Sequence, residues 1–262
     1  MKILRWLAVS FSMYSKIPMP HFAWREEDMA KSLIFFPFVG VITGGLLFLV
    51  NAVSPLSGLP VAVRILLTLV LPLLVTGGFH TDGFMDTEDA LHSYASKEEK
   101  LAILKDPHIG AFAVIAVVKQ LLLLAPAVTA ILLQAQTDRS TLLLLALTLV
   151  LSRAFSGLTS ILLPKAKKDG MLVGETKDRQ GATVCVLVIW ALAAAGLMVY
   201  LHWFYGCVIL AFMAGFTLYY RYKMRKEFGG VTGDTAGWFV TVSETVMALA
   251  LAAALFMYPY VL

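Results

Sequence analysis

Seven long runs of apolar residues divide the chain, and most polar residues gather in the short segments between them. The runs cover residues 32–51, 60–78, 111–133, 140–163, 182–201, 203–220 and 238–258. A stretch of ~20 apolar residues is long enough for a helix to cross the hydrocarbon core of a bilayer. The pattern predicts an all-α integral membrane protein, a polytopic bundle of about seven transmembrane helices that forms a single domain over 1–262.

The break at His202 and the N-terminal segment do not fit a simple series of spans. The fifth and sixth runs are separated only by His202, so they form either a tight helical hairpin or one long broken segment. At the N-terminus, MKILRWLAVSFSMY has a short apolar run without a small-residue cleavage site. We interpret it as an uncleaved amphipathic helix at the membrane surface, with Leu4, Leu7, Ala8 and Phe11 on one face.

Composition supports a membrane protein. Hydrophobic residues make up 59% of the chain and charged residues 15%, against roughly 45–50% and 25% in an average soluble domain. Cys185 and Cys207 both fall inside apolar runs, where we expect them to pack as small apolar residues.

The placement of positive charge predicts the orientation. With the N-terminus inside, seventeen of the 21 Lys and Arg residues fall in the inside segments, and only Arg139 falls in an outside loop. Short cytoplasmic loops carry an excess of Lys and Arg, so a cytoplasmic N-terminus is expected. The same bias accounts for the net charge of +4 without any nucleic-acid partner. Since the acidic residues also gather inside, we expect the chemistry on the cytoplasmic face.

A cluster of carboxylates directly follows the second run, in GGFHTDGFMDTEDALHS over 77–93. If 82–92 is helical, Asp82, Asp86 and Asp89 share one face, because residues spaced i, i+4 and i+7 lie within an arc of about 60°. Glu88 points away from that face, and we expect it to be solvated. Like charges on one face repel, so the arrangement favours a bound cation.

Two interpretations of this cluster stay open from spacing alone. Carboxylate oxygens suit Mg²⁺, which keeps waters and substrate phosphates as its other ligands. Alternatively, an acidic helix simply solvates a cytoplasmic loop. The neighbouring glycines and His80 favour a site, and so do isolated charges within the runs.

Four charged residues lie inside the apolar runs, and three of them are in the predicted cytoplasmic half: Lys119, Arg153 and Glu244. A charge within a span costs a few kcal/mol, so it usually faces the bundle interior with a partner. We expect a cavity open to the cytoplasm and lined by these groups. A purely structural Lys119–Glu244 ion pair is the alternative. Arg64, near the outer end of its run, is expected to snorkel.

Two further inside segments suit phosphate or metal binding. Five basic residues surround glycines in LPKAKKDGMLVGETKDRQG: Lys165, Lys167, Lys168, Lys177 and Arg179. They form either a loop that closes over phosphates or ordinary cytoplasmic charge. In EFGGVTGDTAGWFVTVSE, Asp234 lies in a glycine- and threonine-rich turn before the last run, which is typical of an anion- or metal-holding turn. Lys105 precedes the third run.

These segments together resemble the cobalamin synthase family, the adenosylcobinamide-GDP ribazoletransferases. The motifs that carry the resemblance are YSKIPMP (14–20), FPFVGVITGG (36–45), GGFHTDGFMDTEDA (77–90), ILKDPHIGAF (103–112), LSR (151–153) and GGVTGDTAG (229–237). They occur in the family's order, so the resemblance covers nearly the whole chain. Ala90 stands where the family pattern usually has Gly.

The resemblance implies a Mg²⁺-dependent transfer in the cell inner membrane, late in cobalamin biosynthesis. Adenosylcobinamide-GDP and α-ribazole, or its 5′-phosphate, would be joined with release of GMP. Whether the protein forms homo-oligomers, or docks other enzymes of the corrinoid pathway, stays open.

The site residues follow from this mechanism. Asp82, Asp86 and Asp89 would hold Mg²⁺ on the pyrophosphate. His80 would take the hydroxyl proton or act as an orienting group. Lys105 and Arg153 would neutralise the leaving phosphate, and Asp234 would contact a second metal or one end of a substrate. The remaining candidates for substrate binding are Lys119, Lys168, Lys177 and Glu244.

Two rival functions remain. CDP-alcohol phosphotransferase-like enzymes also place an Asp cluster at the membrane surface, but their DGxxAR continuation is missing after Asp82-Gly83. An ion-coupled transporter would use the charges in the spans as a relay. Transporters commonly show internal repeats and polar groups near the midplane, whereas this chain shows no repeat and its polar residues concentrate at one face.

Overall fold

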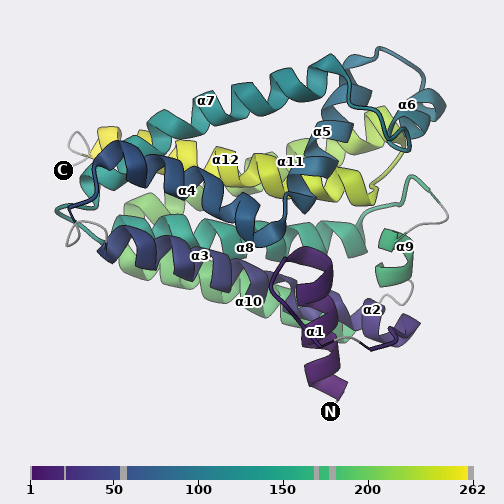
Figure 1. Cartoon of the computed structure of the whole chain (residues 1–262), viewed down its shortest axis with the longest axis horizontal. Coiled ribbons are helices and arrows are strands. Elements are labelled where there is room, and N and C mark those ends of the chain that lie inside the picture. Colours follow the sequence, from purple (N-terminus) through teal and green to yellow (C-terminus); the bar gives the residue numbers. More distant parts are fainter. Residues whose placement is uncertain (1, 21, 54–57, 168–170, 177–180, 259–262) are drawn as a thin grey trace.

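The protein is a bundle of long helices that lie side by side (Figure 1). The computed structural model describes all residues except 1, 21, 54–57, 168–170, 177–180 and 259–262, and the described residues contain no strand. The long helices are α3 (Phe36–Val53), α4 (Val61–Thr76), α7 (Ala111–Gln134), α8 (Ser140–Leu162), α10 (Gly181–Leu201), α11 (Trp203–Phe228) and α12 (Gly233–Met257). The predicted all-α membrane bundle is confirmed.

Six helices in the described part are long and apolar enough to cross a membrane, and the seventh span is irregular. The predicted run 60–78 contains α4, which has only 16 residues and is followed, after a bend of 95°, by α5 (Phe79–His92). At ~1.5 Å per residue, α4 is shorter than the ~30 Å hydrocarbon core. The expected straight span is therefore wrong at this position, although the total of about seven holds if the bent pair counts as one.

The bend between α4 and α5 comes from two glycines. Gly77 and Gly78 have φ of 66° and 79°, in the left-handed region that other residues rarely adopt. A left-handed residue after the last turn ends a helix, and a second one redirects the chain. As a result, α5 leaves the direction of the spans and crosses their ends (Figure 1).

Helices α8 and α12 form the centre of the bundle. About 72% of the span in α8 and 61% in α12 is buried, against 17–44% in the other four spans that are long enough on their own. Helix α3 packs directly on α8 through Gly40 and Gly44, where an added Cβ would lie 2.4 Å from the Leu149 carbonyl oxygen and 2.6 Å from that of Ala146. Small residues four apart let helix backbones approach closely in membranes, which explains the glycines of FPFVGVITGG.

The break at His202 separates two packed helices. His202 has an extended backbone and accepts a hydrogen bond from the Tyr205 N–H, which caps the start of α11. An added Cβ on Gly206 would meet the Met198 backbone at 2.7 Å. The structure thus favours the helical hairpin over one long broken segment.

One polar cluster in the spans differs from expectation. Arg64 is buried and donates to the Asn51 carbonyl oxygen (3.3 Å), while the Asn51 amide donates to Thr68 (2.8 Å). The expectation that Arg64 snorkels to the surface is therefore wrong, because α3 supplies a polar partner inside the protein.

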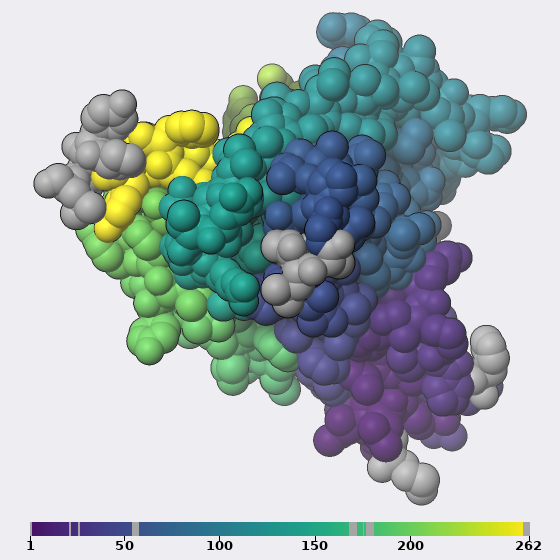
Figure 2. All heavy atoms as spheres, turned by 60° about the vertical axis from the view of Figure 1, so that its left-hand side comes forward, coloured from purple at the N-terminus to yellow at the C-terminus, as the bar shows by residue number. Residues whose placement is uncertain are grey.

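The short helices gather at the end of the bundle that holds α5 (Figure 1). They are α1 (Lys2–Tyr14), α2 (Glu26–Ser32), α6 (Lys97–Ile103) and α9 (Met171–Thr176). Figure 2 shows the N-terminal part at one corner of the molecule. In α1, Leu4 is exposed, whereas Ala8 and Phe11 are buried against the protein. The expected amphipathic helix is present, but only part of its apolar face is free to meet lipid.

Candidate functional site

The candidate site forms where α5 lies on the first turns of α12. An added Cβ on Gly83 would lie 2.8 Å from the Asp234 carbonyl oxygen, and one on Gly237 would lie 3.0 Å from that of His80. The Thr241 hydroxyl donates to the same His80 oxygen (3.3 Å). The glycines of two motifs that lie about 150 residues apart in the sequence therefore bring Asp82 and Asp234 to one place.

Asp82 lies where two hollows meet. The acidic hollow, about 270 Å³, is lined by Asp82, Asp234, Gly233 and Lys167 among others. The N-terminal hollow, about 720 Å³, is lined by Asp82 together with Lys16 and residues around Gly77. Phe79 and Asp82 border both hollows. Asp82 is exposed, so its carboxylate is accessible from either side.

Asp86 is held close to several other carboxylates. Asp86 lies beyond the end of the predicted run 60–78, and there partial burial, followed by the charges of Asp82, Asp234 and Asp89, raises its pKa to about 6. Burial and neighbouring negative charge both disfavour ionisation of a carboxyl group. The cluster therefore has an excess of negative charge that a cation would compensate.

Asp89 is engaged differently from Asp82 and Asp86. Its two carboxylate oxygens accept the backbone N–H groups of Gly110 (2.6 Å) and Ala113 (2.8 Å), at the start of α7. This is the usual role of a helix cap, favoured by the helix dipole. Among the described residues, no three His, Cys, Asp or Glu side chains are arranged so that they alone could hold a metal ion.

Glu88 is not solvated, contrary to expectation. Its side chain is buried and accepts a hydrogen bond from the Trp238 indole N–H (2.7 Å). Trp238 lies on α12, one turn beyond Asp234. Because the opposite face of α5 packs on α12, the residue that points away from the aspartates points into the protein.

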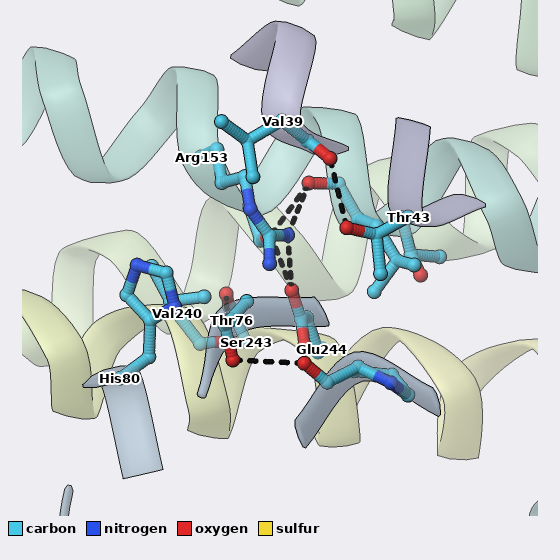
Figure 3. A network of polar contacts seen from close by, with 12 residues as sticks. Val39, Thr43, Thr76, His80, Arg153, Val240, Ser243 and Glu244 are labelled. Carbon is cyan, nitrogen blue, oxygen red and sulfur yellow. Dashed lines mark hydrogen bonds and ion pairs between the residues drawn. The ribbon is translucent and has the colours of Figure 1, made fainter. Parts of the chain in front are cut away.

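A central cavity of about 120 Å³ lies deeper, among α3, α4, α7, α8 and α12. Its polar wall holds an ion pair between Arg153 and Glu244 (2.6 Å), and Glu244 also accepts the Ser152 hydroxyl (3.0 Å). Figure 3 shows these two charged groups directed toward each other, with His80 beside the guanidinium. The expected partnering of charges inside the bundle is found, but between Arg153 and Glu244.

His80 is buried between aromatic rings and the central cavity. Its ring lies 5.4 Å from that of Phe36, 5.5 Å from Phe79 and 6.2 Å from Tyr14. Burial, and secondarily the charge of Arg153, hold the pKa of His80 well below its ordinary value. The imidazole is therefore neutral, and its buried Nε2 has no hydrogen-bond partner among the described residues.

Two other predicted residues, Lys105 and Lys119, lie away from the site. Lys105 is exposed on the loop after α6, and Lys119 is exposed on the outside of α7; neither lines a hollow described above. The alternative Lys119–Glu244 pair is wrong, since the neighbouring Gln120 faces inward and donates to Thr245 (3.2 Å). Lys168 and Lys177 lie outside the described residues.

Sequence reasoning assigned no role to Lys16 and did not separate Lys167 from its basic neighbours. The Lys16 N–H donates to the Val75 carbonyl oxygen (2.8 Å), and the Lys16 side chain covers Gly77. Lys167 follows a short bridge between Lys165 and Val231, which brings it beside Asp234. The motif YSKIPMP contained the signal for Lys16, but only the fold shows that it lies next to α5.

Comparisons with known proteins complete the description. Residues 6–252 match the sequence model of a family described as cobalamin-5-phosphate synthase. An adenosylcobinamide-GDP ribazoletransferase of Lachnoclostridium phytofermentans is 34% identical over 255 residues, covering 95% of this chain and 94% of the relative. One from Pseudomonas fluorescens is 34% identical over 251 residues, covering 94% and 98%. No solved structure matches.

Proposed function

This chain belongs to the cobalamin-5-phosphate synthase family and joins adenosylcobinamide-GDP with ribazole, and we propose that the transfer occurs at Asp82, where the two hollows meet. The observation that carries this proposal is the convergence of Asp82, Asp234 and Lys167 on one hollow. In the reaction, the ribazole hydroxyl forms a new bond to the cobinamide-linked phosphorus while the bond to GMP breaks. Such a step depends mainly on positioning and charge neutralisation.

The acidic hollow is suited to the pyrophosphate. Helix α12 begins at Gly233, which lines this hollow, and the positive end of a helix dipole favours a bound phosphate. Lys167 adds a positive charge from the same wall, and Lys16 adds one across Asp82 in the N-terminal hollow. In this proposal the two lysines take the phosphate-neutralising role first expected of Lys105 and Arg153.

The donor chemistry of the cluster fits Mg²⁺. Asp82, Asp86 and Asp234 offer hard oxygen ligands, and Lys167 compensates their mutual repulsion only in part. With no sufficient protein ligand set among the described residues, we propose that these carboxylates and the substrate's own phosphate oxygens hold the ion together. When bound, Mg²⁺ would neutralise charge that develops on the transferring phosphoryl group.

We propose that His80 is not the group that accepts the hydroxyl proton. An imidazolium at His80 would be buried beside the Arg153 guanidinium, so His80 is better suited to orient the acceptor than to receive a proton. The hydroxyl proton passes instead to a carboxylate of the cluster.

We also propose that the site faces the cytoplasm from the cell inner membrane. The end of the bundle that carries α5, α6 and the Lys167 loop is the end with the excess of Lys and Arg in its short segments. This excess is typical of cytoplasmic loops.

The test measures GMP released from adenosylcobinamide-GDP and α-ribazole by detergent-purified protein. We expect Asp82→Asn to lower the rate by about 100-fold or more, as for loss of a major electrostatic group in an active site. Asp106→Asn serves as the control, since Asp106 is exposed and lies outside all three hollows. Chelation of divalent ions should abolish release, and added Mg²⁺ should restore it.

Full activity of a folded Asp82→Asn protein would contradict the assignment of the reaction centre. Undiminished release after chelation would contradict the metal while leaving the centre in place. The two parts of the proposal are therefore tested separately.

A further inference from the structure

The central cavity shares part of its wall with the N-terminal hollow. Leu73, Thr76 and Thr81 line both, and Thr81 directly precedes Asp82. Its remaining wall is mostly apolar, from side chains such as Leu121, Leu145 and Leu149. The cavity thus offers an apolar interior within one residue of the reaction centre proposed above.

Two polar atoms in the wall have no partner among the described residues. Arg153 is 1% exposed and His80 is 5% exposed, yet Nε of Arg153 and Nε2 of His80 form no hydrogen bond. A buried polar atom without a partner costs about 1–3 kcal/mol. Both residues line the central cavity, and in Figure 3 the guanidinium lies over Glu244 with the imidazole to one side.

Most hydroxyls in the wall are already used as donors. Thr76 and Thr148 donate to carbonyl oxygens of their own helices. Since Arg153 is always protonated, its Nε–H is a donor that lacks an acceptor. The best ligand is therefore a largely apolar group that carries one hydrogen-bond acceptor.

From these observations we infer that the central cavity binds the heteroaromatic base of the ribazole acceptor. Dimethylbenzimidazole is flat and apolar, and the ring nitrogen that does not carry the ribose is an acceptor. The cavity, about 120 Å³, is smaller than the cavity of about 150 Å³ that accommodates benzene, so it takes only part of the ring system, and the ribose lies toward Thr81. This inference rests on the proposed reaction centre at Asp82.

Size-changing substitutions on the cavity wall test the inference. Ala248→Val narrows the cavity, and Leu145→Ala widens it. Ala250→Val is the matched control, because Ala250 is similarly buried on α12 but does not line the cavity. The measured quantities are KM for α-ribazole, for the riboside of unmethylated benzimidazole and for adenosylcobinamide-GDP, together with kcat.

We expect Ala248→Val to raise KM for α-ribazole by about 10-fold or more, the range for one methylene in an apolar pocket. KM for the unmethylated riboside should rise less, and KM for adenosylcobinamide-GDP should stay unchanged. Leu145→Ala should reduce the preference for the methylated base. If Ala248→Val fails to fold, the preference of Leu145→Ala for the methylated base still tests the inference.

Three results would overturn the inference. Equal effects on both ribosides would mean that the methyl groups do not enter the cavity. A change confined to adenosylcobinamide-GDP would assign the cavity to that substrate. Unchanged KM and kcat values in folded variants would mean that neither substrate enters the central cavity, which would then hold lipid or water. None of these results affects the Asp82→Asn test, so failure of the base site and failure of the reaction centre are distinguishable.

Discussion

At the residue scale, the buried ion pair is the feature that sequence reasoning predicted in part. A charge inside a span needs a partner, and this alone placed Arg153 and Glu244 in the interior. It did not pair them, because 91 residues separate them along the chain and the rotation of each helix depends on packing. The same rule predicted an interior position for Lys119, yet the structure places it on the outer surface of α7.

Glu244→Ala should therefore destabilise the protein strongly. Removal of one partner leaves the Arg153 charge buried and uncompensated, which costs about 3–5 kcal/mol. The loss is measured as the temperature of unfolding of purified protein in detergent. The double variant Arg153→Met, Glu244→Leu should recover most of the stability.

Activity of that double variant separates two roles of the pair. The Arg153 Nε–H has no hydrogen-bond acceptor among the described residues. If the pair contacts substrate through this donor, the stable double variant should lose GMP release. Near-normal release would reduce Arg153 and Glu244 to a structural pair.

Glu88 gives a second prediction at this scale. Its position off the aspartate face suggested solvent, and only the packing of α5 on α12 reveals its bond to Trp238. Glu88→Ala should leave the indole N–H unpaired and lower the free energy of unfolding by about 1–3 kcal/mol. Glu98→Ala, an exposed position in α6, should change it little. Equal stability of the two variants would mean that the Trp238 bond contributes nothing.

At the scale of elements, the sequence described the acidic segment better than the end of the second span. The shared face of Asp82, Asp86 and Asp89 depended on residues 82–92 being helical, and α5 covers Phe79–His92. Hydropathy extended the second span to residue 78, because it does not register backbone geometry: Gly77 and Gly78 are compatible with an apolar run but adopt left-handed conformations that end α4.

The contact between α5 and α12 is the element contact on which the site depends. Gly83→Ala would place a Cβ 2.8 Å from the Asp234 carbonyl oxygen and 2.9 Å from its Cα, both backbone atoms that cannot rotate away. The helices would have to separate, and shifts of about 1 Å in a site can cost up to 100-fold in rate. We expect at least a 10-fold loss of GMP release.

The control for this contact is Gly215→Ala. Gly215 lies within α11, and an added Cβ there meets nothing within 4 Å. Alanine favours the helix over glycine by about 1 kcal/mol, so this variant should be fully active and as stable as the parent. Full activity of Gly83→Ala as well would mean that close packing of α5 on α12 is not required for the reaction.

At the scale of the whole molecule, the bundle gathers its reactive groups at one end. Segments before α3, after α4, after α8 and before α12 are far apart in sequence, yet all of them border the hollows around Asp82. Span order alone predicted that these segments share a side of the membrane. It could not predict that Lys16 and Lys167 approach Asp82, because loop paths are set by contacts such as the bridge between Lys165 and Val231.

The orientation of this end is the prediction that remains for the molecule as a whole. After replacement of Cys185 and Cys207 by Ala, single cysteines at Lys97 in α6 and at Thr137 between α7 and α8 report opposite ends of the bundle. A membrane-impermeant maleimide applied to intact spheroplasts should label Thr137→Cys at once and Lys97→Cys only after permeabilisation. The charge bias requires this result, because it places α6 inside and the α7–α8 loop outside. The reverse pattern would put the carboxylates outside the cell, where a reaction that uses a guanosine nucleotide intermediate would lack its substrate.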